Sequence, residues 1–130
     1  MGPELALAID TCVTESTALV ITIVKKIHEV RVWKRRCKNL GSDALTLTEL
    51  LDKRRSAIQS IASLRALKDC LERVASFVEA CATYNLVEVS IDVLLKRTYP
   101  SLRKELLALR ELFLFESVVS RREVRQIASL

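Results

Sequence analysis

Apolar residues recur at alternating steps of three and four along four segments of this 130-residue chain. The segments cover residues 5–27, 33–51, 61–81 and 102–113. These steps keep apolar side chains on one face of a helix with 3.6 residues per turn, whereas a strand would alternate every second residue. The pattern therefore predicts four long amphipathic helices and an all-α fold.

Glycine and proline are scarce, which argues against a fold rich in strands. The chain has 2 Gly and 2 Pro, and both glycines lie before residue 42. Tight turns between strands depend on such residues. Four long helices with short connections pack best as an antiparallel four-helix bundle, and 130 residues suit one domain.

The first break between helices has no Gly or Pro to mark it. One helix over residues 4–52 would be about 74 Å long at ~1.5 Å per residue, too long for a compact domain of this size. We therefore predict a bend near residues 25–31. Polar residues predict two further turns, at residues 52–56 and 83–85.

The last part of the chain is predicted to hold two helices. A short extra helix is expected over residues 86–96, between the third and fourth long helices. Pro100 suits the first turn of a helix, where its missing N–H needs no partner, so the last long helix is expected from Pro100 to about residue 120. The bundle domain would then cover residues 1–120. Residues 121–130 would be a basic C-terminal extension, the start of a connecting helix.

Cysteine and histidine do not occur at the spacing of a metal site. Cys12, Cys37, Cys70 and Cys81 form no CxxC pair, and His28 is the single histidine. A structural zinc site needs four closely placed ligands. We expect the cysteines to be buried, reduced thiols in a reducing compartment, with disulfides as the lesser alternative.

No motif of an enzyme is present. The chain has no Gly-rich phosphate loop, no HExxH and no Ser-His-Asp spacing. Catalysis needs a nucleophile, a base or a metal in a shaped pocket. We therefore expect no catalytic residue, no metal ligand and no cofactor.

Positive charge is concentrated between residues 25 and 38. This stretch has seven basic residues and one acidic residue, Glu29, in a chain of formal net charge +5. The basic residues are Lys25, Lys26, Arg31, Lys34, Arg35, Arg36 and Lys38. The run is either a solvated helix face or a site for an anionic partner, and each basic residue contributes about 1 kcal/mol near an anionic membrane.

Nucleic acid would attract the same charges, but specific recognition also needs groups that read bases. Only Trp33 lies nearby, at a position expected to face the core. An anionic membrane surface is therefore preferred to nucleic acid as the partner.

The first predicted helix is almost long enough and apolar enough to span a bilayer. Residues 5–24 carry only two charges, Asp10 and Glu15. Twenty helical residues match the bilayer core, but each acid at mid-membrane costs about 2.5–3.5 kcal/mol. The segment is either a buried bundle helix or a helix that can leave the bundle and insert. The candidate residues for insertion are Leu5, Ile9, Val13, Leu19, Val20 and Ile23.

The sequence resembles a group of helical cell-death domains. The run Lys34-Arg35-Arg36-Cys37-Lys38-Asn39-Leu40-Gly41, followed by an apolar helix over residues 44–51, resembles the second helix of mixed lineage kinase domain-like (MLKL) four-helix bundles. Residues 67–77 are similar to the third helix of that group, and residues 96–109 to the fourth. The wider group includes fungal HeLo-like domains and helical domains of plant immune receptors. The resemblance covers roughly residues 5–118.

The resemblance implies a function in regulated necrosis (necroptosis) or innate immunity. Domains of this group are cytoplasmic, are held inactive by an attached regulatory module and are recruited to the plasma membrane on activation. They self-associate, bind anionic phospholipids through basic residues and permeabilise the membrane. By position, the seven basic residues between 25 and 38 would contact lipid. The alternative is a non-enzymatic protein-interaction (adaptor) bundle in immune signalling, and a nucleic-acid-binding bundle ranks third.

Overall fold

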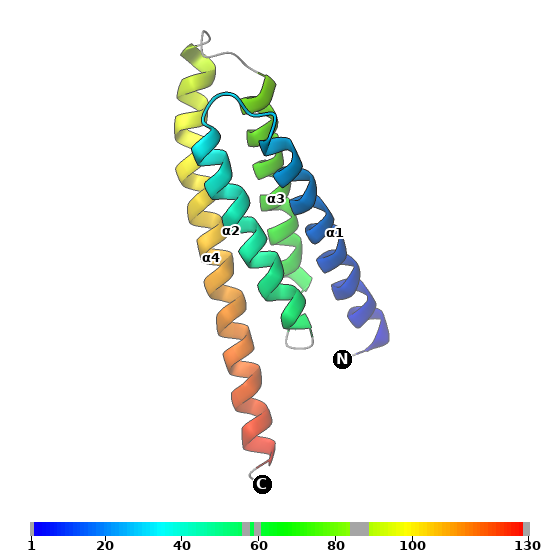
Figure 1. Ribbon diagram of the computed structural model, residues 1–130. Coiled ribbons are helices and arrows are strands. Elements are labelled where there is room, and N and C mark those ends of the chain that lie inside the picture. The colour runs from blue at the N-terminus through cyan, green and yellow to red at the C-terminus, as the bar shows by residue number, and fades with distance from the viewer. Residues whose placement is uncertain (1, 56–57, 59–60, 84–88, 129–130) are drawn as a thin grey trace.

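Four helices make up the described part of the chain (Figure 1). The computed structural model describes residues 2–55, 58, 61–83 and 89–128, and within the last range the side chains of residues 93–115. The helices are α1 (Pro3–Ile27), α2 (Lys34–Lys53), α3 (Ile61–Thr83) and α4 (Val89–Ala128). No strand occurs in these ranges, so the prediction of an all-α chain with four long helices is confirmed.

The helices pack around one apolar core. α1 packs against α2 and α3, which in turn pack against α4. The residues at steps of three and four form that core, and each fully buried Leu or Ile contributes about 1.5–3 kcal/mol of burial free energy. Its largest fully buried side chains include Ile23, Leu40, Leu47, Leu64, Leu71, Leu102 and Leu106. In Figure 1 the chain's two ends lie at one end of the molecule, and the connection between α1 and α2 lies at the other.

The connection between α1 and α2 covers residues 28–33, so the bend predicted near residues 25–31 is present. The N–H of Val30 donates to the carbonyl of Ile27 at 3.1 Å, and the Val30 side chain is buried. Trp33 has φ 58°, in the left-handed region. This conformation costs a residue other than glycine about 1–2 kcal/mol, which the packing of Val30 and Trp33 against the core offsets.

Gly41 lets α1 and α2 approach each other closely. A Cβ atom on Gly41 would lie 2.6 Å from Cδ1 of Ile27, and both residues are buried. A glycine inside a helix costs about 1 kcal/mol relative to alanine. The close contact with Ile27 accounts for a glycine at this position.

The prediction of a separate short helix before Pro100 is wrong for residues 89–96. These residues belong to α4, which continues through Pro100. An internal proline costs about 3 kcal/mol because it removes one backbone hydrogen bond and its ring crowds the preceding turn. Burial of Leu95 on one side and Leu102 on the other contributes about 1.5–3 kcal/mol each and favours the unbroken helix.

The other predicted boundaries agree in part with the structure. α2 ends at Lys53 and α3 ends at Thr83, at the start of the turns predicted there. Residues 84–88, which include most of the predicted third turn, lie outside the described residues. α4 continues past residue 120 to Ala128, and Figure 1 shows it extending beyond the end of α2. The side chains of residues 121–130 are outside those described, so the basic extension stays a prediction.

All four cysteines carry free thiols, and three of them are buried as predicted. Cys12 is only half-buried. Cys37 and Cys81 lie at the contact between α2 and α3, where a hydrogen bond with the Cys81 thiol, together with burial, raises the pKa of Cys37. Burial also raises the pKa of Cys70, to about 12. The thiols of Cys37 and Cys70 therefore stay protonated near neutral pH and act as small apolar side chains, whereas the hydrogen bond with Cys37 lowers the pKa of Cys81.

Candidate membrane-binding surface

The seven predicted lipid-contact residues lie around the connection between α1 and α2, at one end of the molecule (Figure 1). Lys25 and Lys26 occupy the last turn of α1, and Arg31 lies in the connection. The other four, Lys34, Arg35, Arg36 and Lys38, belong to the first turns of α2. All are exposed except Lys26, which is half-buried.

Two of the seven are engaged in contacts within the protein. Lys26 forms ion pairs with Glu29, at 2.7 Å, and with Glu79 of α3, at 3.3 Å. Hydrogen bonds with these two carboxylates, first Glu29 and then Glu79, raise the pKa of Lys26. Arg36 places its guanidinium over the ring of Trp33, 3.8 Å from the ring centroid.

The other five are free to meet a partner, and we refer to them as the basic surface. They are exposed and have no polar partner among the residues that the structure describes. The basic surface consists of Lys25, Arg31, Lys34, Arg35 and Lys38.

The basic residues in the first turn of α2 occupy the unfavourable end of the helix for stability. The first turn of α2 contains no acidic residue, and Trp33 makes no side-chain cap. The N-terminus of a helix carries unpaired N–H groups and the positive end of the dipole, so a nearby cation costs about 0.3–1 kcal/mol. Lys25 and Lys26 lie at the favourable C-terminal end of α1. Helix stability therefore accounts for the lysines of α1, but not for Lys34 and Arg35.

An aromatic cluster supports this end of the molecule. The ring of Phe77 in α3 lies 6.3 Å from that of Trp33 and 6.2 Å from that of Tyr99, centroid to centroid. Asn39 donates a hydrogen bond to the Tyr99 hydroxyl at 3.4 Å. Trp33 was predicted to face the core and is half-buried, with Phe77 on one side and Arg36 on the other.

Tyr99 and Asn39 were not among the residues predicted for this site. Tyr99 follows Leu95 by four residues and precedes Leu102 by three, so it continues the apolar pattern of α4. The assignment of Pro100 to a helix start hid that continuity.

The six candidate insertion residues of α1 face the protein interior. Ile9, Val13, Val20 and Ile23 are buried, and Leu5 and Leu19 are half-buried against the core. The large apolar residues that α1 exposes are Leu7, at 68%, and Ile21, at 50%. Among the described residues, α1 is the one helix with the length and composition to cross a membrane, a test that buried core helices also pass.

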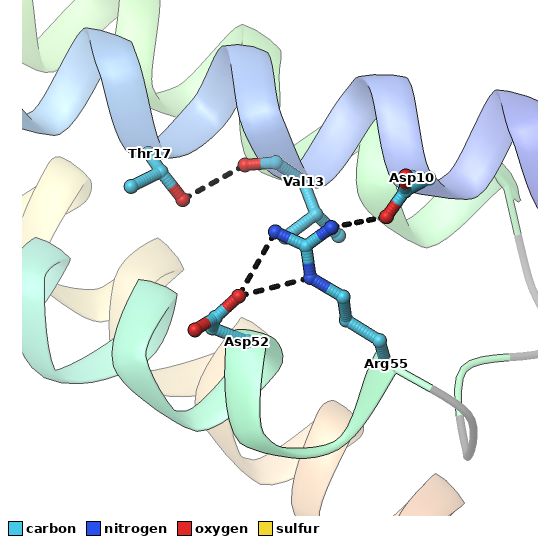
Figure 2. Close-up of polar contacts among 5 residues, drawn as sticks. All are labelled: Asp10, Val13, Thr17, Asp52 and Arg55. Atoms are coloured by element: carbon cyan, nitrogen blue, oxygen red, sulfur yellow. Dashed lines mark hydrogen bonds and ion pairs between the residues drawn. The ribbon is translucent and has the colours of Figure 1, made fainter.

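Two of the three acids of α1, Asp10 and Glu15, are paired with bases from elsewhere in the chain. Figure 2 shows the guanidinium of Arg55 between Asp10 of α1 and Asp52 of α2; its Nε lies 2.9 Å from an oxygen of Asp52. Lys68 of α3 forms an ion pair with Glu15, and the hydrogen bond raises the pKa of Lys68. These pairs link α1 to the rest of the bundle and compensate the charges of Asp10 and Glu15.

Nothing in the described part of the chain resembles a metal centre, because no three His, Cys, Asp or Glu side chains there are placed to hold an ion. No protein-family model, curated protein or solved structure matches this chain.

Proposed function

We propose that the chain is an antiparallel four-helix bundle that binds anionic phospholipids and permeabilises membranes in regulated necrosis or innate immunity. It acts without catalysis or cofactor. A regulatory module holds it inactive in the cytoplasm, and activation leads to self-association and recruitment to the plasma membrane. The positions of the chain ends and of the first connection in Figure 1 support the antiparallel arrangement, and the family resemblance supports the cell-death function.

The observation that carries the proposal is the basic surface around the connection between α1 and α2. Its five side chains have no polar partner among the described residues. Two of them, Lys34 and Arg35, lie in the first turn of α2, whose first N–H groups have no partner within the helix. A helix N-terminus with nearby cations is suited to a phosphate group.

The size of the attraction is sufficient for reversible binding. Five basic residues at about 1 kcal/mol each contribute roughly 5 kcal/mol at an anionic bilayer. Salt screens such interactions, with a Debye length of about 8 Å at physiological ionic strength. Trp33 lies at the same end, and tryptophan is favoured at the boundary between water and lipid.

Permeabilisation requires α1 to leave the core, because its apolar face is buried there. The ion pairs of Asp10 with Arg55 and of Glu15 with Lys68 oppose that step. An unpaired acid costs about 2.5–3.5 kcal/mol at the bilayer centre, so α1 is expected to stay docked until the basic surface has engaged the membrane.

The test is dye release from vesicles with and without anionic phospholipid. The test variant replaces Arg31, Lys34, Arg35 and Lys38 with Gln, and keeps Arg36 because it packs on Trp33. A matched control replaces four exposed bases elsewhere, Lys53, Arg65, Lys104 and Arg110, with Gln. Both variants lose four positive charges, so they differ only in where the charge is lost.

We expect the parent and the control to bind and release dye only from anionic vesicles, in a salt-sensitive manner, and the test variant to lose both. Emission from Trp33, the chain's single tryptophan, reports binding separately from release. Equal loss of binding and release in the two variants would show that the effect depends on net charge alone and not on the basic surface. Absence of binding by the parent would contradict the proposal.

A protein-interaction module is the second candidate, because α4 exposes apolar side chains. Phe115 is 66% exposed, and Leu107 and Leu112 are partly exposed on the same helix. Apolar side chains that are exposed as one contiguous patch are typical of contact with another chain. Retention of a protein partner by the variant that lacks the basic surface, without vesicle binding by the parent, would favour this function.

A further inference from the structure

An open groove of about 460 Å³ lies between α3 and the first described turns of α4. Its apolar lining includes Phe77 and Ala80 from α3 and Leu94, Leu95 and Leu102 from α4. Leu94 is 62% exposed, so a large apolar side chain meets solvent at the groove. None of the five residues of the basic surface lines it.

Most polar groups of the groove already have partners. Arg73 forms ion pairs with Glu105 of α4 and, at 3.2 Å, with Asp69. The hydroxyls of Ser76 and Thr98 donate to carbonyls of their own helices, to Glu72 at 3.1 Å and to Leu94 at 2.7 Å. These side chains leave little hydrogen-bonding capacity for a ligand.

Arg97, unlike Arg73, is not held in an ion pair with any of the described residues. It is exposed, it lines the groove, and it has no polar partner among the described residues. It therefore provides an uncompensated positive charge beside an apolar floor. This combination selects for a ligand with an apolar body and an anionic group.

The shape of the groove indicates an extended ligand. Its lining residues in α4 run from Leu94 to Leu102, about 12 Å along the helix at ~1.5 Å per residue. The volume lies in the range of about 300–1,000 Å³ that is usual for small-molecule sites. We propose that this groove binds a free, single-chain aliphatic carboxylate, with the chain along α3 and α4 and the carboxylate at Arg97.

The position of Phe77 provides a direct readout. Phe77 lines the groove, and its ring lies edge-on to that of Trp33. A ligand against Phe77 changes the surroundings of the chain's single tryptophan without touching it. The measurement is titration of the protein with dodecanoate below its micellar concentration, followed by Trp33 emission, with native mass spectrometry for stoichiometry. Dodecylammonium, which has the same chain and the opposite charge, is the ligand control.

Two variants test the two ends of the ligand. Arg97→Gln is expected to weaken dodecanoate binding about 1.4- to fivefold, because an exposed ion pair contributes about 0.2–1 kcal/mol. Ser101→Leu fills the groove from an exposed position and is expected to weaken binding about tenfold or more. Arg110→Gln removes an exposed charge from α4 outside the groove and is the matched control, with affinity unchanged.

The proposal is supported by one bound dodecanoate, weaker binding of dodecylammonium and the expected order of the variants, with far-ultraviolet circular dichroism to show that each variant is folded. It is overturned if dodecanoate does not bind below its micellar concentration, if both ligands bind equally, or if Arg97→Gln and Ser101→Leu bind like the parent.

Vesicle binding separates this site from the basic surface. Ser101→Leu should bind anionic vesicles as the parent does, because the basic surface is intact. If Ser101→Leu lost vesicle binding as well, the groove would hold an acyl chain of a bilayer lipid, and the proposal of a free carboxylate would be wrong. Failure of the parent to bind vesicles would leave the dodecanoate result unaffected.

Discussion

The guanidinium of Arg36 lies over the indole ring of Trp33, with its central carbon 3.8 Å from the ring centroid. Phe77 packs against the same indole, edge to face. Trp33 is the residue that turns the chain into α2 through a left-handed backbone conformation. The contact therefore fixes the connection between α1 and α2. Arg36 lies next to residues of the basic surface in the sequence, but its function is structural.

The contact predicts unequal effects for two neighbouring arginines. Arg36→Gln should lower the free energy of unfolding by about 0.5–1 kcal/mol, the usual contribution of an exposed cation–π contact. Arg35→Gln should leave it unchanged or raise it by up to about 1 kcal/mol, because Arg35 has no polar partner among the described residues and its charge lies at the N-terminus of α2. Urea unfolding followed by Trp33 emission measures both. Equal stability of the two variants would mean that the stacking does not stabilise the connection.

The contact of Gly41 with Ile27 predicts a coupled effect of two substitutions. Gly41→Ala should destabilise the parent by about 1 kcal/mol or more, because the added Cβ would lie 2.6 Å from Cδ1 of Ile27 in a buried site. Ile27→Val removes that methyl group. Gly41→Ala made in the Ile27→Val background should be neutral or stabilising, since alanine is the better helix former.

The measurement for this pair is a double-mutant cycle by urea unfolding. A coupling free energy of about 1 kcal/mol is expected for residues in direct contact. Additive effects of the two substitutions would show that α1 and α2 adjust to the extra carbon without cost.

The helices and most of the core could be predicted from the spacing of apolar residues alone. Leu40, Leu64, Leu71 and Leu106 lie in the predicted stripes and are fully buried. The spacing is predictive because it identifies which side chains share one face of a helix, and that apolar face is the one that packs against the core. The sequence could not show how the first connection is made, because its left-handed residue is Trp33, a residue type that gives no turn signal.

The course of α4 could not be predicted for a related reason. Pro100 is a local signal for a helix start, while Leu95, Tyr99 and Leu102 bury a continuous face against other helices. The free energy gained by burying this face exceeds the local cost of a proline inside the helix.

For the candidate site, the sequence showed where the basic residues lie. It could not tell that Lys26 is paired with Glu29 and Glu79, because Glu79 is remote in the chain.

The ion pairs of α1 predict how readily this helix opens. The double substitution Arg55→Gln and Lys68→Gln should speed hydrogen exchange of α1 amides more than that of α3 amides, because it removes the partners of Asp10 and Glu15. Arg65→Gln, an exposed change in α3, is the control. If the proposed function holds, the double variant should also release dye from anionic vesicles faster. Unchanged exchange in α1 would show that apolar packing alone holds the helix.

The raised pKa of Cys70 predicts that the protein loses stability at alkaline pH. Burial, and then the nearby charge of Glu105, raises the pKa of its thiol to about 12 against the opposing effect of Arg73. The ordinary value is about 9, so between these values the unfolded chain loses the proton while the folded protein keeps it. Unfolding is then favoured increasingly as pH rises, and the stabilisation is fully present only below about pH 9.

Comparison with Cys70→Ala isolates this effect, because all other groups titrate in both proteins. The difference in unfolding free energy between the parent and Cys70→Ala should be constant from pH 6 to about pH 8. Above about pH 9 it should shift against the parent by about 1.4 kcal/mol for each pH unit. Urea unfolding under reducing conditions from pH 6 to about pH 10.5 measures it. A difference that stays constant over the whole range would show that the Cys70 thiol titrates alike in the folded and unfolded chains, contrary to its burial between α3 and its neighbours.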